Sequence, residues 1–312
     1  MIERRTVTSA NPTLAGLSWP VFEATGERDG PRLTLLAGIH GAEYPAIAAV
    51  RAFMRELDTS ALAGSILAVP IASPTSFRVR SAFVVPEDGR NLNRAFPGRA
   101  DGSFSDALAD HLFQEFIAGS GLLVDLHGGD LFEALEPFTI YEDSPQRETA
   151  HRLACAFNFP YVIRERGGDL RGMTSAAAAD AGIPAVIAEA GGCGLLEPGA
   201  VQRHLDGLHN ALRAAGMLAG PVIAPPAGQR LVEDFRWLRC ANAGWWQSEV
   251  EVGATVVSGK RLGAILDPFG DDLEEIAAPL AGAVVFLTTS PAVDSDGLLM
   301  AIGGALGPVG QG

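Results

Sequence analysis

The sequence predicts an α/β domain with a mostly parallel sheet and helices on both faces, followed by a small all-β domain. Through the first two thirds of the chain, short apolar runs alternate with stretches of helical periodicity. After a segment rich in proline and glycine at 219–230, only short β-like runs separated by glycines follow. We therefore expect a larger first domain at 1–220 and a second, barrel- or sandwich-like domain at 231–304.

The strands and helices of the first domain follow from the residue pattern. Five runs are too apolar for half-exposed strands and predict buried ones, at 33–39, 66–72, 122–126, 138–141 and 184–190. Pro45 is expected to open the first helix, and Ser105 to cap a later one. Further helices are expected near 146–158, 173–182 and 199–216.

Composition excludes several classes of function. The 23 basic and 37 acidic residues give a net charge of −14, which argues against a nucleic-acid partner. The only lysine is Lys260, so no glycine-rich loop ending in Lys-Ser or Lys-Thr is present to bind nucleotide phosphates. The first residues lack the apolar run of a signal peptide, no stretch approaches the roughly 18 apolar residues of a membrane span, and the three cysteines are far apart. The natural expectation is a cytoplasmic protein without a membrane partner.

Two histidines follow predicted strands and are next to glycines. His40 and Glu43 lie between the strand at 33–39 and the helix opened by Pro45, and His127 directly follows the strand at 122–126. Two histidines and one glutamate are a common zinc set in hydrolases, because they leave a position open for water. Alternatively, each histidine is bonded to nearby backbone. Asp125, two residues before His127, either orients a ligand or the water, or is a buried capping residue.

Two further motifs carry charge. Residues 78 to 99 hold five arginines, which favours a loop that binds a substrate carboxylate through paired hydrogen bonds; the alternative is a solvated loop paired with Glu87 and Asp88. Glu189 ends an apolar strand, where a carboxyl group must be paired or have a raised pKa. Next to a metal, such a glutamate is suited to act as a general base.

In combination, the four motifs resemble one known family. Gly-x-His-Gly-x-Glu, Asn-Leu-Asn-Arg with Phe-Pro-Gly, Asp-Leu-His-Gly and Glu-x-Gly-Gly occur in this order over about residues 33–195. They resemble the succinylglutamate desuccinylase/aspartoacylase family, whose fold is related to zinc carboxypeptidases. The resemblance implies one zinc per chain on His40, Glu43 and His127, with Glu189 as the catalytic base. It also implies that Asn93 and Arg94 bind the carboxylate and carbonyl of the substrate.

The resemblance implies a deacylase that removes an acetyl, succinyl or similar group from an N-acyl amino acid, and the sequence is similar to the branch with ectoine-pathway deacetylases. A further family arginine precedes the Asn-Arg pair; Arg80 is the main candidate for it, with Arg78 and Arg90 as alternatives. The tyrosine that carboxypeptidases carry before the catalytic glutamate has no counterpart in 165–172. A carboxypeptidase and an inactive zinc-binding protein remain the alternative functions, and assembly into a homo-oligomer stays open.

Overall fold

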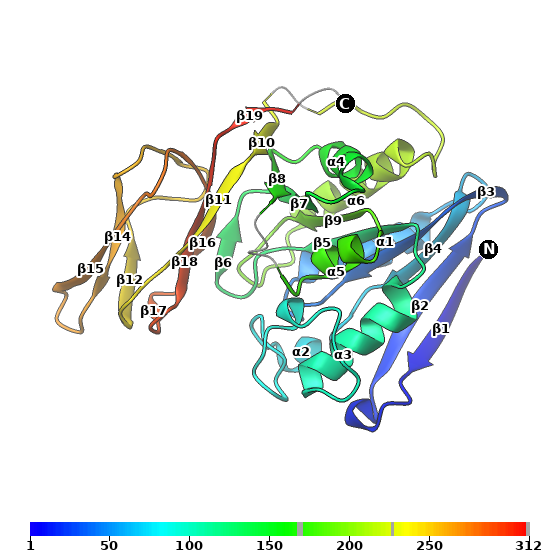
Figure 1. The fold of residues 1–312 in the computed structure, drawn as a ribbon, viewed down its shortest axis with the longest axis horizontal. Helices are drawn as coiled ribbons and strands as arrows, with labels where there is room; N and C mark the ends of the chain where they lie inside the picture. The colour runs from blue at the N-terminus through cyan, green and yellow to red at the C-terminus, as the bar shows by residue number, and fades with distance from the viewer. Residues whose placement is uncertain (167–170, 226–227, 310–312) are drawn as a thin grey trace.

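The computed structural model describes residues 1–166, 171–225 and 228–309, and a ten-stranded sheet forms its centre (Figure 1). The strand order in this sheet is β1-β2-β4-β3-β5-β9-β7-β8-β10-β19. Its strands are β1 (Ile2–Thr8), β2 (Ser18–Thr25), β3 (Arg28–Ala37), β4 (Ala63–Val69), β5 (Leu122–His127), β7 (Phe138–Glu142), β8 (Tyr161–Glu165), β9 (Ala185–Glu189), β10 (Arg230–Val232) and β19 (Gly307–Pro308).

The central pairings confirm the predicted sheet. The pairs β4–β3, β3–β5, β5–β9, β7–β8 and β8–β10 are parallel, while β7 runs antiparallel to β9. All five predicted strands are present. Strands β1 and β2 were not predicted: they form an antiparallel edge, and five of the seven residues of β1 are exposed, so no apolar run marks it.

Helices cover both faces of the sheet, as predicted. One hydrophobic cluster joins it to α1 (Tyr44–Glu56), α4 (Arg147–Ala156) and α6 (Pro198–Ala214). A second cluster on the other face contains α3 (Phe104–Leu112) and α5 (Thr174–Asp180). Shorter segments are α2 (Pro74–Val79), two 3₁₀ turns, η1 (Pro12–Leu14) and η2 (Leu92–Arg94), and a π-helical turn η3 (Phe113–Ile117).

The prediction that Ser105 caps α3 was wrong. The cap is Ser103, whose hydroxyl accepts from the backbone N–H of Asp106 while the Asp106 carboxylate accepts from the backbone N–H of Ser103. Ser105 lies within the first turn, buried, and its hydroxyl donates to Asp88. The two serines are two residues apart, and only Ser103 has an acidic residue three positions later.

The C-terminal module, residues 234–304, consists of two antiparallel sheets. One has the order β11-β18-β16-β13, with β11 (Asp234–Arg239), β13 (Thr255–Val256), β16 (Gly282–Thr288) and β18 (Leu298–Gly304). The other has the order β15-β14-β12-β17, with β12 (Gly244–Ser248), β14 (Arg261–Leu266), β15 (Asp272–Ala277) and β17 (Ala292–Val293). Strand β6 (Glu133–Leu135), which follows β5 in the chain, pairs with β16 and joins the module to the first domain (Figure 1). No helix of the described residues is long and apolar enough to cross a membrane.

Candidate metal centre and its cavity

The predicted metal ligands and the predicted base lie at the carboxyl ends of three neighbouring parallel strands, β3, β5 and β9. His40 follows β3, His127 ends β5, and Glu189 ends β9 as the Cα partner of His127. This edge is where ligands bind in open α/β sheets. The parallel register therefore brings together residues that are up to 149 positions apart, 189 minus 40, in the sequence.

Two glycines shape the loop that carries His40 and Glu43. Gly38 has a φ of +69°, a conformation that favours glycine. A Cβ on Gly41 would lie 2.1 Å from the backbone nitrogen of Phe77 in α2, which is closer than any side chain allows. The loop therefore turns sharply and places Glu43 at the N-cap of α1, beside His40.

The three predicted ligands converge. One ligand atom from each of His40, Glu43 and His127 lies within 4.8 Å of the others, and this is the one such group among the described residues. His40 Nδ1 lies 2.6 Å from Glu43 Oε1, and His127 Nδ1 lies 2.9 Å from Glu43 Oε2. Glu43 and His127 are almost fully buried. Two imidazoles and one carboxylate are a donor set that fits a zinc ion.

The outer hydrogen bonds fix which nitrogen of each histidine turns inward. His127 Nε2 lies 3.0 Å from Asp125 Oδ2, and His40 Nε2 lies 3.1 Å from Asn91 Oδ1. If each Nε2 carries a proton and donates it outward, each Nδ1 faces Glu43 and can act as a metal ligand, which is how metal-binding histidines are usually oriented. Asp125 is fully buried and also accepts from the Thr174 hydroxyl, so it acts on His127 as a second-layer partner.

Charge is concentrated in this cluster. Burial opposes ionisation of Glu43, but the two histidines beside it lower its pKa to about 2. Burial also opposes protonation of His127, and Asp125 and Glu43 outweigh it and raise the pKa of His127 well above its ordinary value. Without a metal, the carboxylates therefore attract protons to the histidines. A divalent cation satisfies the same carboxylates and would displace those protons.

Two carboxyl groups near the cluster have raised pKa values. Burial raises the pKa of Glu189 to about 8, against the opposing effect of His127. Burial likewise raises the pKa of Glu133, which lines the same cavity, to about 7. Glu133 was not predicted from the sequence, because it lies in a short strand and only its distance of six residues from His127 marks it.

Asn93 and Arg94, the predicted substrate-binding pair, line the cavity together with His40, Glu43 and Glu189. Asn93 Oδ1 accepts from the backbone N–H of Thr174, and its buried Nδ2 has no hydrogen-bond partner among the described residues. The hydrogen bond to Oδ1 fixes the orientation of the Asn93 amide and leaves its Nδ2–H donors available. Burial and Arg239 lower the pKa of Arg94, and Glu189 acts in the opposite direction.

The upstream arginines lie elsewhere. Arg80 is exposed at the end of α2, with a φ of 57°, and does not line the cavity. Arg78 is also exposed, and Arg90 forms an ion pair with Asp106 at 2.8 Å and bonds to Ser103. In this conformation none of the three is brought to the metal ligands. Of the tyrosine-free segment 165–172, residues 167–170 lie outside the described chain.

The cavity has a volume of about 610 Å³, and the C-terminal module forms part of its wall. Trp237 and Arg239 of β11, Phe286 of β16 and Asp296 line it together with His40 and Glu43. No motif in the sequence of this module predicts these cavity-lining positions. The side chains that line this cavity therefore come from both parts of the chain.

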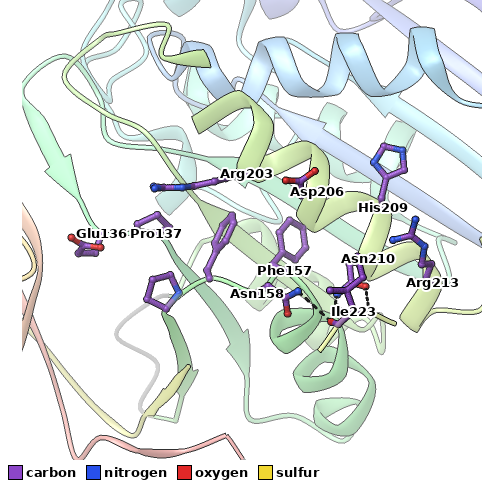
Figure 2. Close-up of a pocket in the computed structure, with 12 residues that line it drawn as sticks. Glu136, Pro137, Phe157, Asn158, Arg203, Asp206, His209, Asn210, Arg213 and Ile223 are labelled. Atoms are coloured by element: carbon purple, nitrogen blue, oxygen red, sulfur yellow. Dashed lines mark hydrogen bonds between the residues drawn. The ribbon is translucent and has the colours of Figure 1, made fainter. Parts of the chain in front are cut away.

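A second cavity, of about 770 Å³, lies along α6 and contains none of the predicted site residues (Figure 2). Arg203, Asp206 and His209 of α6 are among the residues that line it (Figure 2). Asn210 is bonded to the backbone of Ile223 and Ala156. No cluster of potential metal ligands among the described residues lies there, so the first cavity remains the candidate active site.

Comparisons with known proteins agree with this geometry. The sequence model of the succinylglutamate desuccinylase/aspartoacylase catalytic domain matches residues 29–215. The chain is 28% identical over 245 residues to N-alpha-acetyl-L-2,4-diaminobutyric acid deacetylase of Halomonas elongata, covering 77% of this chain and 71% of that protein.

Solved structures share the fold of the whole chain. The product-bound ectoine utilization protein EutE (DoeB) from Ruegeria pomeroyi superposes with a TM-score of 0.83 at 23% identity, covering 97% of this chain and 95% of that chain. A succinylglutamate desuccinylase/aspartoacylase from Rhodobacter sphaeroides gives 0.82 at 23% identity, covering 98% and 94%. The predicted fold class is confirmed. With its family match and its His40–Glu43–His127 cluster, the chain belongs to the succinylglutamate desuccinylase/aspartoacylase family of metal-dependent deacylases.

Proposed function

We propose that this protein is a zinc-dependent amidohydrolase that removes a small acyl group, such as acetyl or succinyl, from an N-acyl amino acid. The convergence of His40, Glu43 and His127 at the cavity that Glu189 also lines is the observation that carries this proposal. The Halomonas relative acts on an N-acetylated amino acid, which supports acetyl as the first acyl group to test.

His40 Nδ1, Glu43 and His127 Nδ1 would hold one zinc ion, and Asp125 and Asn91 would orient the two imidazoles. Zinc held by three protein ligands lowers the pKa of a bound water to about 7 and polarises a carbonyl group. Glu189 would accept the proton of the attacking water and deliver it to the leaving amine. Burial raises the pKa of Glu189, and the positive charge of a bound ion would lower it again, which favours the carboxylate form that accepts the proton.

Asn93 and Arg94 would bind the substrate. The free Nδ2–H of Asn93 and the guanidinium of Arg94 supply hydrogen-bond donors at the cavity wall. A carboxylate or a developing oxyanion would satisfy both. Arg80 remains a candidate only if the loop after α2 changes conformation, because its side chain is exposed here.

The test is a hydrolysis panel with zinc-loaded protein against N-acetyl and N-succinyl amino acids, Nα-acetyl-L-2,4-diaminobutyrate and dipeptides. We expect turnover of N-acyl amino acids, measured as release of free amine, and little turnover of dipeptides. Faster cleavage of dipeptides would assign a carboxypeptidase instead. Stoichiometric zinc without turnover of any amide would support an inactive zinc-binding protein.

A further inference from the structure

The C-terminal module brings polar side chains to the cavity that are not satisfied within the described protein. Trp237 and Arg239 are two residues apart on β11 and both line the cavity, while Leu238 between them packs into the core of the module. This is the alternation expected of a strand. The indole Nε1 of Trp237 is buried, and no described residue accepts its hydrogen bond.

The positive charge of Arg239 is only weakly compensated by neighbouring groups. Its Nη1 donates to the backbone carbonyl of Asp296, and the Asp296 carboxylate is 3.7 Å away with an exposed fraction of 85%. An ion pair at that distance and exposure contributes little. A guanidinium has five N–H donors, so most of those of Arg239 remain available at the cavity wall.

Arg94 faces the same cavity from the first domain. Its Nη1 donates to the backbone carbonyl of Asn93, and no ion pair with a carboxylate is found for it among the described residues. Arg239 is close enough to disfavour the charged form of Arg94. The two positive charges at this cavity repel each other, and a bound anion would compensate both.

We propose that Arg239 is a specificity residue of the active site, and that it binds the carboxylate of the substrate jointly with Arg94. The carboxylate would then lie between the two parts of the chain, with the Trp237 N–H as a further donor. The other titratable side chains of the cavity wall, His40 apart, are the carboxyl groups of Glu43, Glu133, Glu189, Asp294 and Asp296, none of which supplies positive charge to a carboxylate. The two arginines are therefore where an acidic ligand is accommodated. The identity of the ligand as an N-acyl amino acid rests on the proposed function.

The first experiment compares Arg239→Gln with Arg236→Gln. Arg236 is on the same strand, is 56% exposed, is paired with Asp234 at 2.8 Å, and does not line the cavity. Loss of a charge-assisted hydrogen bond predicts that Arg239→Gln raises the KM for Nα-acetyl-L-2,4-diaminobutyrate, or for the best substrate of the panel, about 10- to 100-fold with kcat nearly unchanged. Arg236→Gln should leave both unchanged, and Arg239→Lys should recover part of the loss. Equal effects of the two glutamine variants, or a loss confined to kcat, would overturn the proposal.

The second experiment measures binding without turnover, which separates this proposal from the proposed function. In a Glu189→Gln background, calorimetry compares the same N-acetyl amino acid as the free acid and as the primary carboxamide. The acid should bind more tightly, and Arg239→Gln should abolish that preference while retaining a normal melting temperature. If wild type hydrolyses no amide but the preference depends on Arg239, the proposed function fails and this inference stands. A protein that binds acid and carboxamide equally would refute the inference, whatever it hydrolyses.

Discussion

Replacement of Glu189 by glutamine is the sharpest test of the catalytic assignment. The change keeps the shape of the side chain at the end of β9 and removes its ability to accept a proton. Loss of a general base costs about 10² to 10⁴ in kcat, which corresponds to about 2.7 to 5.4 kcal/mol of transition-state stabilisation. Metal content should stay normal, because Glu189 is not in the His40–Glu43–His127 cluster.

The cavity offers a matched control for this experiment. Glu133 lines the same cavity, and burial raises its pKa as well, to about 7. Its Oε2 accepts a hydrogen bond from the backbone N–H of Asp130 at 2.9 Å. Among the described residues, the Glu189 carboxyl has no such hydrogen bond to the backbone. We expect Glu133→Gln to lower kcat far less than Glu189→Gln, with zinc measured by atomic absorption in both variants. Wild-type turnover by Glu189→Gln, or the reverse order of the two variants, would refute the assignment of the base.

Four further predictions concern the metal, the substrate and stability. His127→Ala should lose the zinc, measured as metal per chain, whereas His151→Ala, whose imidazole instead contacts Cys155, should retain it. Asp125→Asn should weaken zinc affinity about 10- to 100-fold in a chelator competition, because His127 loses its charged partner; unchanged affinity would leave Asp125 as a capping residue only. If Arg94 anchors the substrate carboxylate, Arg94→Lys should raise KM. If Arg94 stabilises the oxyanion, the same change should lower both kcat and kcat/KM. Wild-type kinetics would show that Arg94 is not part of the site. Burial raises the pKa of Glu142 to about 7 from an ordinary 4.5, so the folded chain keeps a proton that the unfolded chain releases, and this group makes stability fall as pH rises from about 4.5 to 7. Glu142→Gln should therefore raise the free energy of unfolding at pH 8 by about 1 to 3 kcal/mol and leave it nearly unchanged at pH 4; equal effects at both pH values would contradict this.

The central fold was predictable because its signals are local. Buried parallel strands need continuous apolar runs, and the five that β3, β4, β5, β7 and β9 provide are each visible in the sequence. The metal ligands were predictable for a related reason. Parallel strands bring their carboxyl ends to one edge, so polar residues that follow neighbouring strands are expected to meet.

The edge of the sheet was less accessible to sequence reasoning. Strand β1 is stabilised by pairing with β2, and its exposed side chains leave no apolar pattern to detect. Strand β10 is three residues long, lies at the end of the proline- and glycine-rich segment, and joins the large sheet only through long-range pairing with β8 and β19. Such pairing depends on the tertiary structure and cannot be predicted from a short stretch of sequence.

The side chains that the C-terminal module contributes to the cavity could not be predicted from the sequence either. Trp237 and Arg239 are an aromatic and a basic residue in a short strand, an arrangement that equally suits an exposed face of an all-β module. They line the cavity because the module lies beside the strand ends of the first domain, where β6 pairs with β16. Strand β6 begins six residues after His127, the last residue of β5, so the loop that contains Gly128 and Gly129 connects this histidine to the strand that pairs with the module. The position of the module therefore depends on the backbone that carries His127. A substitution in β6 should alter substrate binding by Arg239 without changing any of the three proposed metal ligands.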